Sequence, residues 1–404
     1  MLVIKIMKFE KYDLDPLLKE NLNKIGFKRP TDIQFRAITP IMNGEDVLAI
    51  AQTGTGKTAA FAIPMIDYLT KNRKKTRVIR CLILVPTREL ATQIHDVFNQ
   101  IGFNTGVKSM SLFGGVEQDK QIKALQEGVD VLITTPGRMF DLISQGYVRL
   151  ENLETLILDE ADHMLDLGFL KDIKDLMRHI PQRRQSLFFS ATITDSIRKL
   201  AYSIVRNPIR IQISPENPVN KNIDHSILLS EMDDKRFYLE QLIKEQPDQK
   251  MLVFVRTKVR AERVVKAMER AGIESIAIHG DIEQKERFKI LNDFKANKTK
   301  LLIATDVSAR GIDVPNIDIV VNYDLPDKPE NYVHRVGRTG RADNKGLAIS
   351  FCSREEKQML KEIEEFIGYK IEILKVNLKN TEEKINIKEA NKPYDWQSLM
   401  DEED

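Results

Sequence analysis

Cysteine and long hydrophobic runs are scarce in this chain. Only two cysteines occur among its 404 residues, Cys81 and Cys352, and each lies inside an apolar run. They predict neither a zinc site nor a disulfide framework, and we interpret both as small buried hydrophobic residues. The longest apolar runs, such as residues 47–51 and 82–85, fall well short of the roughly 18 residues that a membrane span requires. These absences exclude a disulfide-stapled secreted domain and an integral membrane protein.

The chain also lacks a large excess of one charge. It has 62 Lys and Arg against 60 Asp and Glu, and its net charge is +2. Residues 1–213 carry 30 basic and 24 acidic side chains, whereas the rest of the chain carries 32 and 36. Net charge therefore does not decide whether nucleic acid binds. Residues 1–7 include a lysine within the apolar stretch and no small-residue cleavage site, so we expect no signal peptide and a cytoplasmic location.

What the chain does contain is a repeated alternation of short apolar runs with amphipathic segments, beginning at residue 46. This alternation is typical of α/β domains, in which a parallel sheet is covered by helices on both faces. We expect a first series of strands at residues 47–51, 82–85, 107–112, 131–134, 156–158 and 187–189, and we expect that series to end there. We expect a second series at residues 227–229, 252–255, 275–278, 301–304, 319–321 and 347–351.

The segment between the two series contains two prolines among polar residues and has no hydrophobic periodicity. It predicts an interdomain linker at residues 214–220. The length of the chain also favours two domains, since one domain typically takes about 100–200 residues. We therefore predict α/β domains at 1–213 and 221–370. The polar residues 371–404 predict one strand or helix fragment followed by a mobile acidic tail.

A glycine-rich segment follows the first expected strand and opens a helix. Such a turn presents backbone N–H groups and a helix N-terminus to phosphate oxygens. Lys57 would reach the β- and γ-phosphates of a triphosphate, and Thr58 would hold Mg²⁺ through its hydroxyl. The strict phosphate-loop pattern begins with glycine, whereas this segment begins with alanine. In full it reads Ala51-Gln52-Thr53-Gly54-Thr55-Gly56-Lys57-Thr58.

Acidic residues follow the strand expected at 156–158, in the order Asp159-Glu160-Ala161-Asp162. The first two carboxylates would emerge at the carboxyl edge of the sheet, where doubly wound sheets bind ligands. Asp159 is then the natural partner of Mg²⁺, and Glu160 is placed to orient and deprotonate an attacking water. The alternative is that these residues only cap a helix, and the presence of the phosphate loop argues against it.

Together, seven motifs in this order resemble the DEAD-box ATP-dependent RNA helicases, and most closely the short bacterial members of the RNA-helicase-E type. The resemblance covers roughly residues 9–370, and alanine at the start of the phosphate loop is normal in that family. It implies two tandem RecA-like domains, each a mostly parallel sheet covered by helices. The motifs are the phosphate loop, the acidic run at 159–162, and the segments at 86–90, 135–138, 190–192, 304–313 and 334–341.

Residues 26–34, with Phe9 lying 17 positions before Gly26, resemble the adenine-reading segment of this family. A glutamine amide can accept from adenine N6 and donate to N7, whereas guanine offers an acceptor at the first of these places. We therefore expect Gln34 to select ATP over GTP, Phe27 to contact the base and Phe9 to support it. The alternative is a helix-capping Thr31 followed by a surface glutamine.

Three arginines lie close together within residues 334–341. Their mutual repulsion would be costly unless an anion lay nearby, which a triphosphate would supply. The resemblance implies that Arg338 and Arg341 are arginine fingers on the γ-phosphate. It also implies that His334 and Arg335 bridge to motifs of the first domain such as Asp162. A solvated basic helix is the alternative.

RNA binding that does not depend on sequence needs only donors to phosphates and 2′-hydroxyls. The resemblance places such contacts at Arg88, Gly115, Thr135, Arg138, Arg287 and Thr305. Structural ion pairs remain the alternative for Arg88 and Arg287. The resemblance also gives a ribose contact and two residues that link the nucleotide state to the RNA state, namely Asp313, Ser190 and Thr192. The basic segment 71–80 we interpret as a solvated loop, and His163 and His279 match no metal-ligand spacing.

The sequence thus predicts an RNA-dependent ATPase that uses ATP and Mg²⁺ to open short RNA duplexes or to remodel RNA–protein complexes. Two alternatives would have the same fold as this ATPase: an ATP-dependent RNA clamp, and a DNA translocase with the same two ATP-driven domains. RNA is the expected partner, bound largely through its backbone. Ribosome-assembly or RNA-decay proteins are candidate protein partners, and no membrane partner is expected.

Overall fold

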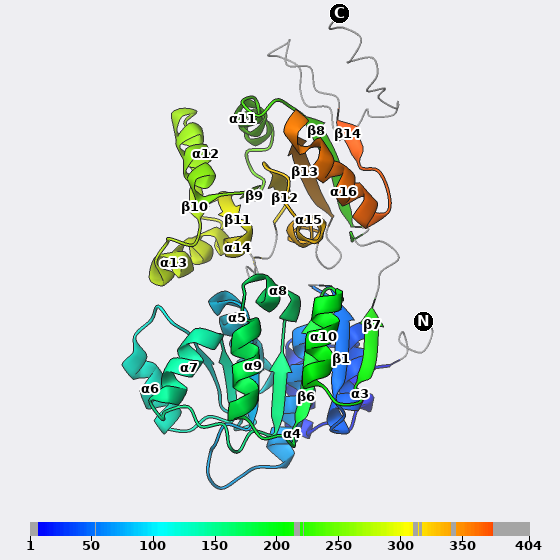
Figure 1. The fold of residues 1–404 in the computed structure, drawn as a ribbon, viewed down its shortest axis with the longest axis vertical. Helices are drawn as coiled ribbons and strands as arrows, with labels where there is room; N and C mark the ends of the chain where they lie inside the picture. Colours follow the sequence, from blue (N-terminus) through cyan, green and yellow to red (C-terminus); the bar gives the residue numbers. More distant parts are fainter. Residues whose placement is uncertain are drawn as a thin grey trace, which may run out of the picture. The chain divides into compact units, whose positions relative to one another are not determined.

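The computed structural model describes residues 7–52, 54–213, 219–220, 222–309, 314, 317–340 and 345–374. The chain divides into two units, Met1–Ser214 and Pro215–Asp404, and each unit has a sheet and a buried core of its own (Figure 1). Three predicted site residues lie outside the described residues, namely Thr53, Asp313 and Arg341. So do most of the predicted linker and the predicted tail from residue 375 onward.

The first unit is built on seven parallel strands, whose order across the sheet is β3-β4-β2-β5-β6-β1-β7. Every residue of β1, β2, β4 and β5 is buried, as expected for strands that are covered on both faces. In chain order the strands are β1 (Val47–Ala51), β2 (Cys81–Leu84), β3 (Ser109–Leu112), β4 (Val131–Thr134), β5 (Thr155–Leu158), β6 (Gln185–Ser190) and β7 (Ile209–Ile213).

Helices cover both faces of this sheet (Figure 1). Threonine side chains begin two of them by accepting from backbone N–H groups: Thr87 accepts from Leu90, and Thr194 accepts from Ile197. The helical elements are η1 (Phe9–Lys11), α2 (Pro16–Lys24), α3 (Asp32–Met42), α4 (Lys57–Lys71), α5 (Arg88–Ile101), α6 (Gln118–Gln126), α7 (Pro136–Ser144), α8 (Ala161–Asp166), α9 (Leu170–His179) and α10 (Asp195–Ile204).

The second unit has another sheet of seven parallel strands, in the order β10-β11-β9-β12-β13-β8-β14. Its strands are β8 (Ile223–Leu229), β9 (Met251–Val255), β10 (Ile276–Ile278), β11 (Leu301–Thr305), β12 (Ile319–Asn322), β13 (Gly346–Cys352) and β14 (Glu372–Leu374). Its helical elements are α11 (Lys235–Glu245), α12 (Lys258–Arg270), α13 (Gln284–Lys295), α14 (Asp306–Ala309), α15 (Pro329–Val336), η2 (Arg354–Glu356) and α16 (Lys357–Ile367).

The two units share one strand order. When the strands are numbered from the first strand of each unit, both sheets read 3-4-2-5-6-1-7. The carboxyl end of a given strand therefore has the same neighbours in both sheets. Two copies of one architecture lie in tandem along the chain.

One strand differs from the prediction, and a second agrees with one of the two forms that the sequence left open. We expected the first series to end with the strand at 187–189, and this is wrong, because β7 pairs in parallel with β1 at the edge of the sheet. Its residues alternate between isoleucine and polar side chains, so it does not form a continuous apolar run. The last strand, β14, pairs with β8 at the point where the sequence suggested one strand or helix fragment.

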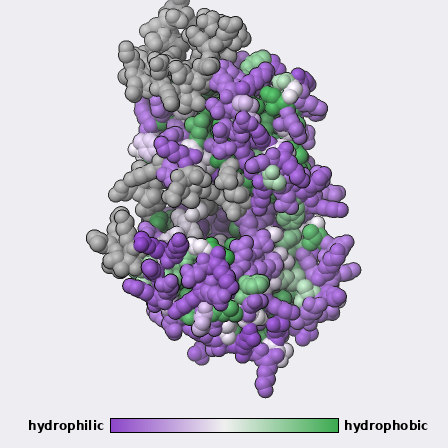
Figure 2. Space-filling view, turned by 180° about the vertical axis from the view of Figure 1, so that it is seen from behind, coloured by the Kyte–Doolittle hydropathy of each residue, from purple (hydrophilic) through white to green (hydrophobic). Residues whose placement is uncertain are grey.

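The surface is largely polar. Figure 2 shows hydrophilic side chains over most of the visible face, with hydrophobic ones scattered among them. Such scattering is normal for a folded protein in water. No described helix combines the length and the apolar character that crossing a membrane would require.

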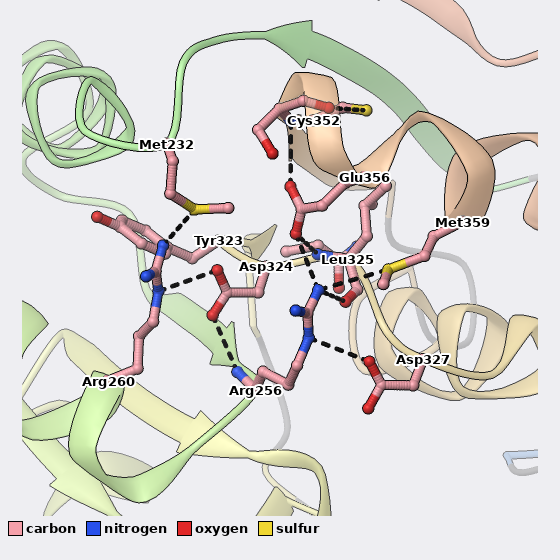
Figure 3. Close-up of polar contacts among 12 residues, drawn as sticks. Met232, Arg256, Arg260, Tyr323, Asp324, Leu325, Asp327, Cys352, Glu356 and Met359 are labelled. Atoms are coloured by element: carbon pink, nitrogen blue, oxygen red, sulfur yellow. Dashed lines mark hydrogen bonds and ion pairs between the residues drawn. The ribbon is translucent and has the colours of Figure 1, made fainter.

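Charged side chains are buried together in the second unit, beside the carboxyl ends of β9 and β12 (Figure 3). Glu356 accepts from Lys235 Nζ at 2.5 Å, from Arg256 Nη2 at 3.1 Å and from the backbone N–H of Leu325 at 3.1 Å. Asp324 accepts from the backbone N–H of Arg256 at 3.0 Å. Neither Lys235 nor Glu356 is more than 1% exposed, so each charge depends on its partners.

We expect Lys235→Met to destabilise the second unit by about 3–5 kcal/mol, because the substitution leaves the buried Glu356 carboxylate short of a cation. Urea unfolding of the full chain, followed by circular dichroism, measures this loss. Lys258→Met is the matched control, because Lys258 pairs with Asp281 on the surface and its loss should change little. Equal midpoints for both variants would show that the buried pair contributes nothing particular.

Candidate nucleotide and RNA site

The predicted site residues of the first unit follow the carboxyl ends of its strands, and they divide that edge of the sheet into two halves. The phosphate loop, the acidic run and residues 190–192 follow or end β1, β5 and β6, which are neighbours in the sheet. The predicted RNA residues follow β2, β3 and β4, which are also neighbours. Parallel strands bring segments that are far apart in sequence to one edge of the sheet. The predicted nucleotide residues and the predicted RNA residues therefore lie next to each other along that edge.

The phosphate loop is a tight turn between β1 and α4. Gly54 and Gly56 both have left-handed backbones, with φ of 81° and 93°, and Thr55 Oγ1 donates to the Gln52 carbonyl at 2.8 Å. A Cβ atom on Gly56 would come within 2.5 Å of Gln34 Nε2. Glycine is required at this position both by the backbone conformation and by the close approach of Gln34.

Lys57 and Asp159 are buried groups of opposite charge that influence each other. The Lys57 ammonium is buried and has no hydrogen-bond partner among the residues that the structure describes. Burial raises the pKa of the Asp159 carboxyl to about 6, an effect that the positive charge of Lys57 opposes. An unpaired buried ammonium at the start of a helix suits a phosphate group.

The residues present suit a magnesium ion that is held largely by water and by substrate phosphates. No group of three or more His, Cys, Asp and Glu side chains that could hold a metal occurs in the described part of the chain. Mg²⁺ usually keeps several waters and is held by one or two carboxylates together with substrate phosphates. Asp159 and the hydroxyl of Thr58 fit such a site, in which the nucleotide supplies the remaining oxygens.

Glu160 and Asp162 follow β5 in different surroundings. Glu160 has a left-handed backbone, with φ of 51°, which is uncommon for a residue other than glycine and is often found at functional sites. Asp162 Oδ2 accepts from the backbone N–H groups of Ala191 and Thr192, at 3.0 and 2.9 Å, and from Thr192 Oγ1 at 3.1 Å. Ser190 Oγ in turn donates to the Thr192 carbonyl at 2.8 Å. These hydrogen bonds therefore hold the acidic run against the segment at the end of β6.

Gln34 is buried at the start of α3, and its amide is already engaged. Its Oε1 accepts from the backbone N–H of Thr31 at 3.0 Å, and its Nε2 donates to the Gly56 carbonyl at 3.1 Å. A primary amide has a second N–H and a second lone pair, so a purine edge can still be recognised. The contact with Gly56, which the motif alone did not reveal, ties the adenine-reading segment to the phosphate loop.

Phe9 and Phe27 lie together, with ring centroids 5.8 Å apart. Both line a pocket of about 360 Å³ beside α2, together with Lys8, Lys19 and Arg29 among other residues. Neither Gln34 nor the phosphate loop lines this pocket. The structure thus brings the two predicted aromatic residues together, and it places Gln34 against the phosphate loop.

The predicted RNA residues of the first unit lie in turns and at helix starts. Arg88 begins α5, and a Cβ atom on Gly114 would lie 3.8 Å from its Nη2, so its guanidinium is next to the turn that contains Gly115. Thr135 precedes the first residue of α7. Arg138 Nη1 donates to Gln121 Oε1 at 2.9 Å. These positions form one stretch of the edge across β2, β3 and β4.

In the second unit, Thr305 and Arg287 follow neighbouring strands. Thr305 ends β11, and its Oγ1 donates to Ser308 Oγ at 3.3 Å. Arg287 is buried in α13, and its guanidinium donates to the carbonyls of His279 and Ser308 at 3.4 and 3.3 Å. The contacts to two carbonyl groups give Arg287 a structural role within this unit, whatever else it binds.

Arg335 makes four hydrogen bonds inside the second unit. It donates to both carboxylate oxygens of Asp306 at 2.6 and 2.7 Å, to the Asp324 carbonyl at 2.6 Å and to Asn322 Oδ1 at 3.3 Å. These bonds occupy most of its donors and leave little for the bridge to the first unit that we expected. Arg338 lies in the turn just after α15, and its Nε donates to the His334 carbonyl at 3.2 Å.

The basic segment 71–80 lies at the other end of the strands, before β2 begins. Most of its cations have partners within the unit: Arg80 and Lys74 both pair with Glu154, and Arg73 donates to the Thr105 carbonyl. Arg77 lies near Asp130. We interpreted this segment as a solvated loop; it does lead from α4 to β2, away from the edge that carries the candidate site, but most of its cations also have partners within the unit.

Comparisons with known proteins agree with this geometry. Residues 31–200 match the DEAD/DEAH box helicase family, and residues 234–343 match the helicase conserved C-terminal domain. The ATP-dependent RNA helicase RhlB of Serratia proteamaculans is 40% identical over 92% of this chain and 88% of its own length. The ATP-dependent RNA helicase CshA of Listeria monocytogenes is 38% identical over 89% of this chain and 68% of its own.

Solved structures are similar as well. Dbp5 of S. cerevisiae, bound to RNA and ADP BeF3, has a TM-score of 0.82 and 32% identity over 91% of this chain and 95% of its own. The chain belongs to the DEAD-box family of ATP-dependent RNA helicases. The predicted fold class, two tandem RecA-like domains, is confirmed. The narrower resemblance to the helicase-E type stays a prediction.

Gln34→Ala should weaken ATP binding by about 0.5–1.5 kcal/mol and abolish the preference for ATP over GTP, because the amide that we expect to read the adenine edge is lost. Titration of both nucleotides against the variant measures this change. Thr31→Val is the matched control, since it alters the same helix start but keeps the glutamine. If Gln34→Ala still prefers ATP, the segment does not read the base.

Proposed function

We propose that this protein is an RNA-dependent ATPase that locally unwinds short RNA duplexes, or remodels RNA–protein complexes, by closing its two units on one RNA strand when ATP is bound. One observation carries the proposal. At the edge of the first sheet, the residues predicted to bind nucleotide follow or end the neighbouring strands β5, β6 and β1, and those predicted to bind RNA follow β3, β4 and β2. We call these the nucleotide half and the RNA half of the edge. Ligands bound at the two halves would be neighbours on one rigid sheet, so each could influence the other.

In the nucleotide half, the free N–H and lone pair of Gln34 would read adenine, while the loop N–H groups and Lys57 would hold the phosphates. Asp159 and Thr58 would hold Mg²⁺, which supplies charge neutralisation when bound. Glu160 would orient the attacking water and accept its proton as the water oxygen bonds to the γ-phosphorus. The bond between that phosphorus and the bridging oxygen then breaks, which releases ADP and phosphate.

The remaining charge would come from the second unit, through Arg338 and Arg341. Because the phosphate loop and these arginines belong to different units, neither unit alone would be a complete enzyme. Hydrolysis would stay slow until RNA favours the closed form. Asp162 would report the nucleotide state to residues 190–192, to which it is hydrogen-bonded.

RNA would be held through its backbone by Arg88, Gly115, Thr135 and Arg138 in the first unit. Thr305 and Arg287 would add contacts in the second. A strand held in this way can be bent out of duplex geometry, so that its complement dissociates. Support comes from similar solved structures that were determined with both ligands, such as yeast Dbp5 bound to RNA and ADP BeF3, and Mss116p bound to ssRNA and AMP-PNP.

The test combines two measurements on the full chain. ATP hydrolysis is followed with RNA and with DNA of the same sequence, and displacement of one strand from a short RNA duplex is followed with ATP. We expect stimulation by RNA alone and strand displacement at catalytic ATP turnover. Equal stimulation by DNA would favour a translocase, and RNA retention without displacement would favour a clamp.

The cytoplasmic location and the candidate protein partners, in ribosome assembly or RNA decay, belong to the same proposal. The location rests on the sequence, in which only two cysteines occur, and both are free and buried in the structure. The protein partners are proposed from the kind of RNA work that the family resemblance implies. Crosslinking in cells, followed by sequencing of the bound RNA and identification of the captured proteins, tests the partners, and cell fractionation tests the location. Capture of ribosomal precursors or decay factors would support the proposed partners.

Glu160→Gln should slow hydrolysis by about 10² to 10⁴-fold while ATP and RNA still bind, because the general base is lost and Asp159 remains. The closed state then cannot end by phosphate release, so RNA should dissociate more slowly with ATP than with ADP. The measurement is RNA dissociation in ATP, in ADP and without nucleotide. Equal rates in all three would contradict ATP-driven closure.

Arg338→Ala should leave ATP affinity nearly unchanged and reduce RNA-stimulated hydrolysis by about 10³ to 10⁵-fold, the range that arginine fingers supply in related phosphate chemistry. Steady-state hydrolysis and nucleotide titration of the full chain separate the two effects. Arg354→Ala is the control, because Arg354 is an exposed arginine of the same unit that pairs with Glu231. Retained stimulation in Arg338→Ala would make Arg338 structural.

A further inference from the structure

A histidine lies against the proposed general base. His163 is the third residue of α8, three positions after Glu160, and its ring is only 5% exposed. Its Nδ1 lies 3.4 Å from Glu160 Oε2. Glu160 is the residue just before α8, and His163 lies one helical turn after it. Side chains with this spacing at a helix start regularly meet.

The chemistry of the pair defines the state of the ring. An ionised carboxylate only accepts hydrogen bonds, so Nδ1 must carry a proton to face Glu160 favourably. The other ring nitrogen is Nε2. It is buried and has no hydrogen-bond partner among the residues that the structure describes.

Packing alone does not account for this ring. A buried ring nitrogen without a partner lowers stability, and an apolar side chain of similar size would avoid that cost. The two neighbouring carboxylates are both held in place: Asp159 Oδ1 accepts from the backbone N–H of Glu160, and Asp162 accepts from Thr192. His163 provides the corresponding contact for the Glu160 side chain.

We propose that His163 is a positioning residue, whose Nδ1–H holds the Glu160 carboxylate in the orientation that the attacking water requires. The inference rests on the proposed role of Glu160. His163 touches neither water nor nucleotide in this scheme, and it acts through the carboxylate. A 3.4 Å separation suits this role, because catalytic hydrogen bonds are often long before the substrate is bound.

The test compares two substitutions in the full chain. His163→Leu removes the donor and keeps an apolar side chain of similar size, whereas His163→Asn keeps an N–H near the place of Nδ1. RNA-stimulated kcat should fall about threefold to tenfold in His163→Leu, with KM for ATP unchanged, and should largely recover in His163→Asn. His95→Leu is the matched control, since His95 is a half-buried histidine of the same unit that contacts Ser109 and Asn99.

Thermal unfolding separates positioning from a structural role. His163→Leu should be at least as stable as the unmodified protein, because the unpaired Nε2 is removed. Activity and stability would then change in opposite directions, which is the expected cost of a polar group kept for function. A loss of both activity and stability in His163→Leu, or equal loss of kcat in both His163 variants, would overturn the proposal.

A double-mutant cycle with Glu160→Gln completes the test. If His163 acts only through the carboxylate, His163→Leu should not reduce the residual hydrolysis of Glu160→Gln any further. An additional reduction of the same size would show that His163 acts independently, and would overturn the proposal. Failure of the proposed function is distinguishable, because Glu160→Gln alone would then hydrolyse ATP at a near-normal rate.

Discussion

Parallel pairing of all the strands in each sheet is the constraint on which the remaining structure depends. It brings the carboxyl ends of seven strands to one edge, however far apart their residues lie in the sequence. The phosphate loop at 51–58 and residues 190–192 become neighbours because β1 and β6 pair directly. Each connection must cross back over the sheet, and the helices that do so cover the apolar strands. The site and the core therefore follow from one topological choice.

Short hydrogen-bonded links join the segments that this edge brings together. The amide of Gln34 links the adenine-reading segment to Gly56, and Asp162 links the acidic run to Thr192. In the second unit, Arg335 links α15 to Asp306, the residue that follows β11. Each link joins two segments of one unit, so a ligand that moves one segment acts directly on the next. Such coupling requires no contact beyond those within the unit.

The sequence predicted most of the fold because buried parallel strands are continuous apolar runs, such as residues 131–134, which match β4 at both ends. It missed β7, whose alternating side chains are those of an edge strand with one exposed face, a pattern that a search for apolar runs passes over. The motifs indicated which residues are candidates for the site. They did not indicate the partners of Arg335 or the contact between Gln34 and Gly56, since these depend on which turns the sheet order brings together.

The shared strand order has a consequence for the way in which the protein is made. In each unit, the pairing of its first strand with its sixth strand closes a long stretch of chain, as in β1 with β6 and β8 with β13. Pairing across such distances makes folding slow compared with helical proteins, and it leaves strand edges exposed in the meantime. Because each unit has its own sheet and core, residues 1–214 can complete their sheet while the ribosome is still adding the rest. Because the architecture is repeated in tandem, the chain can fold in two shorter steps, one unit after the other, and not in one long step.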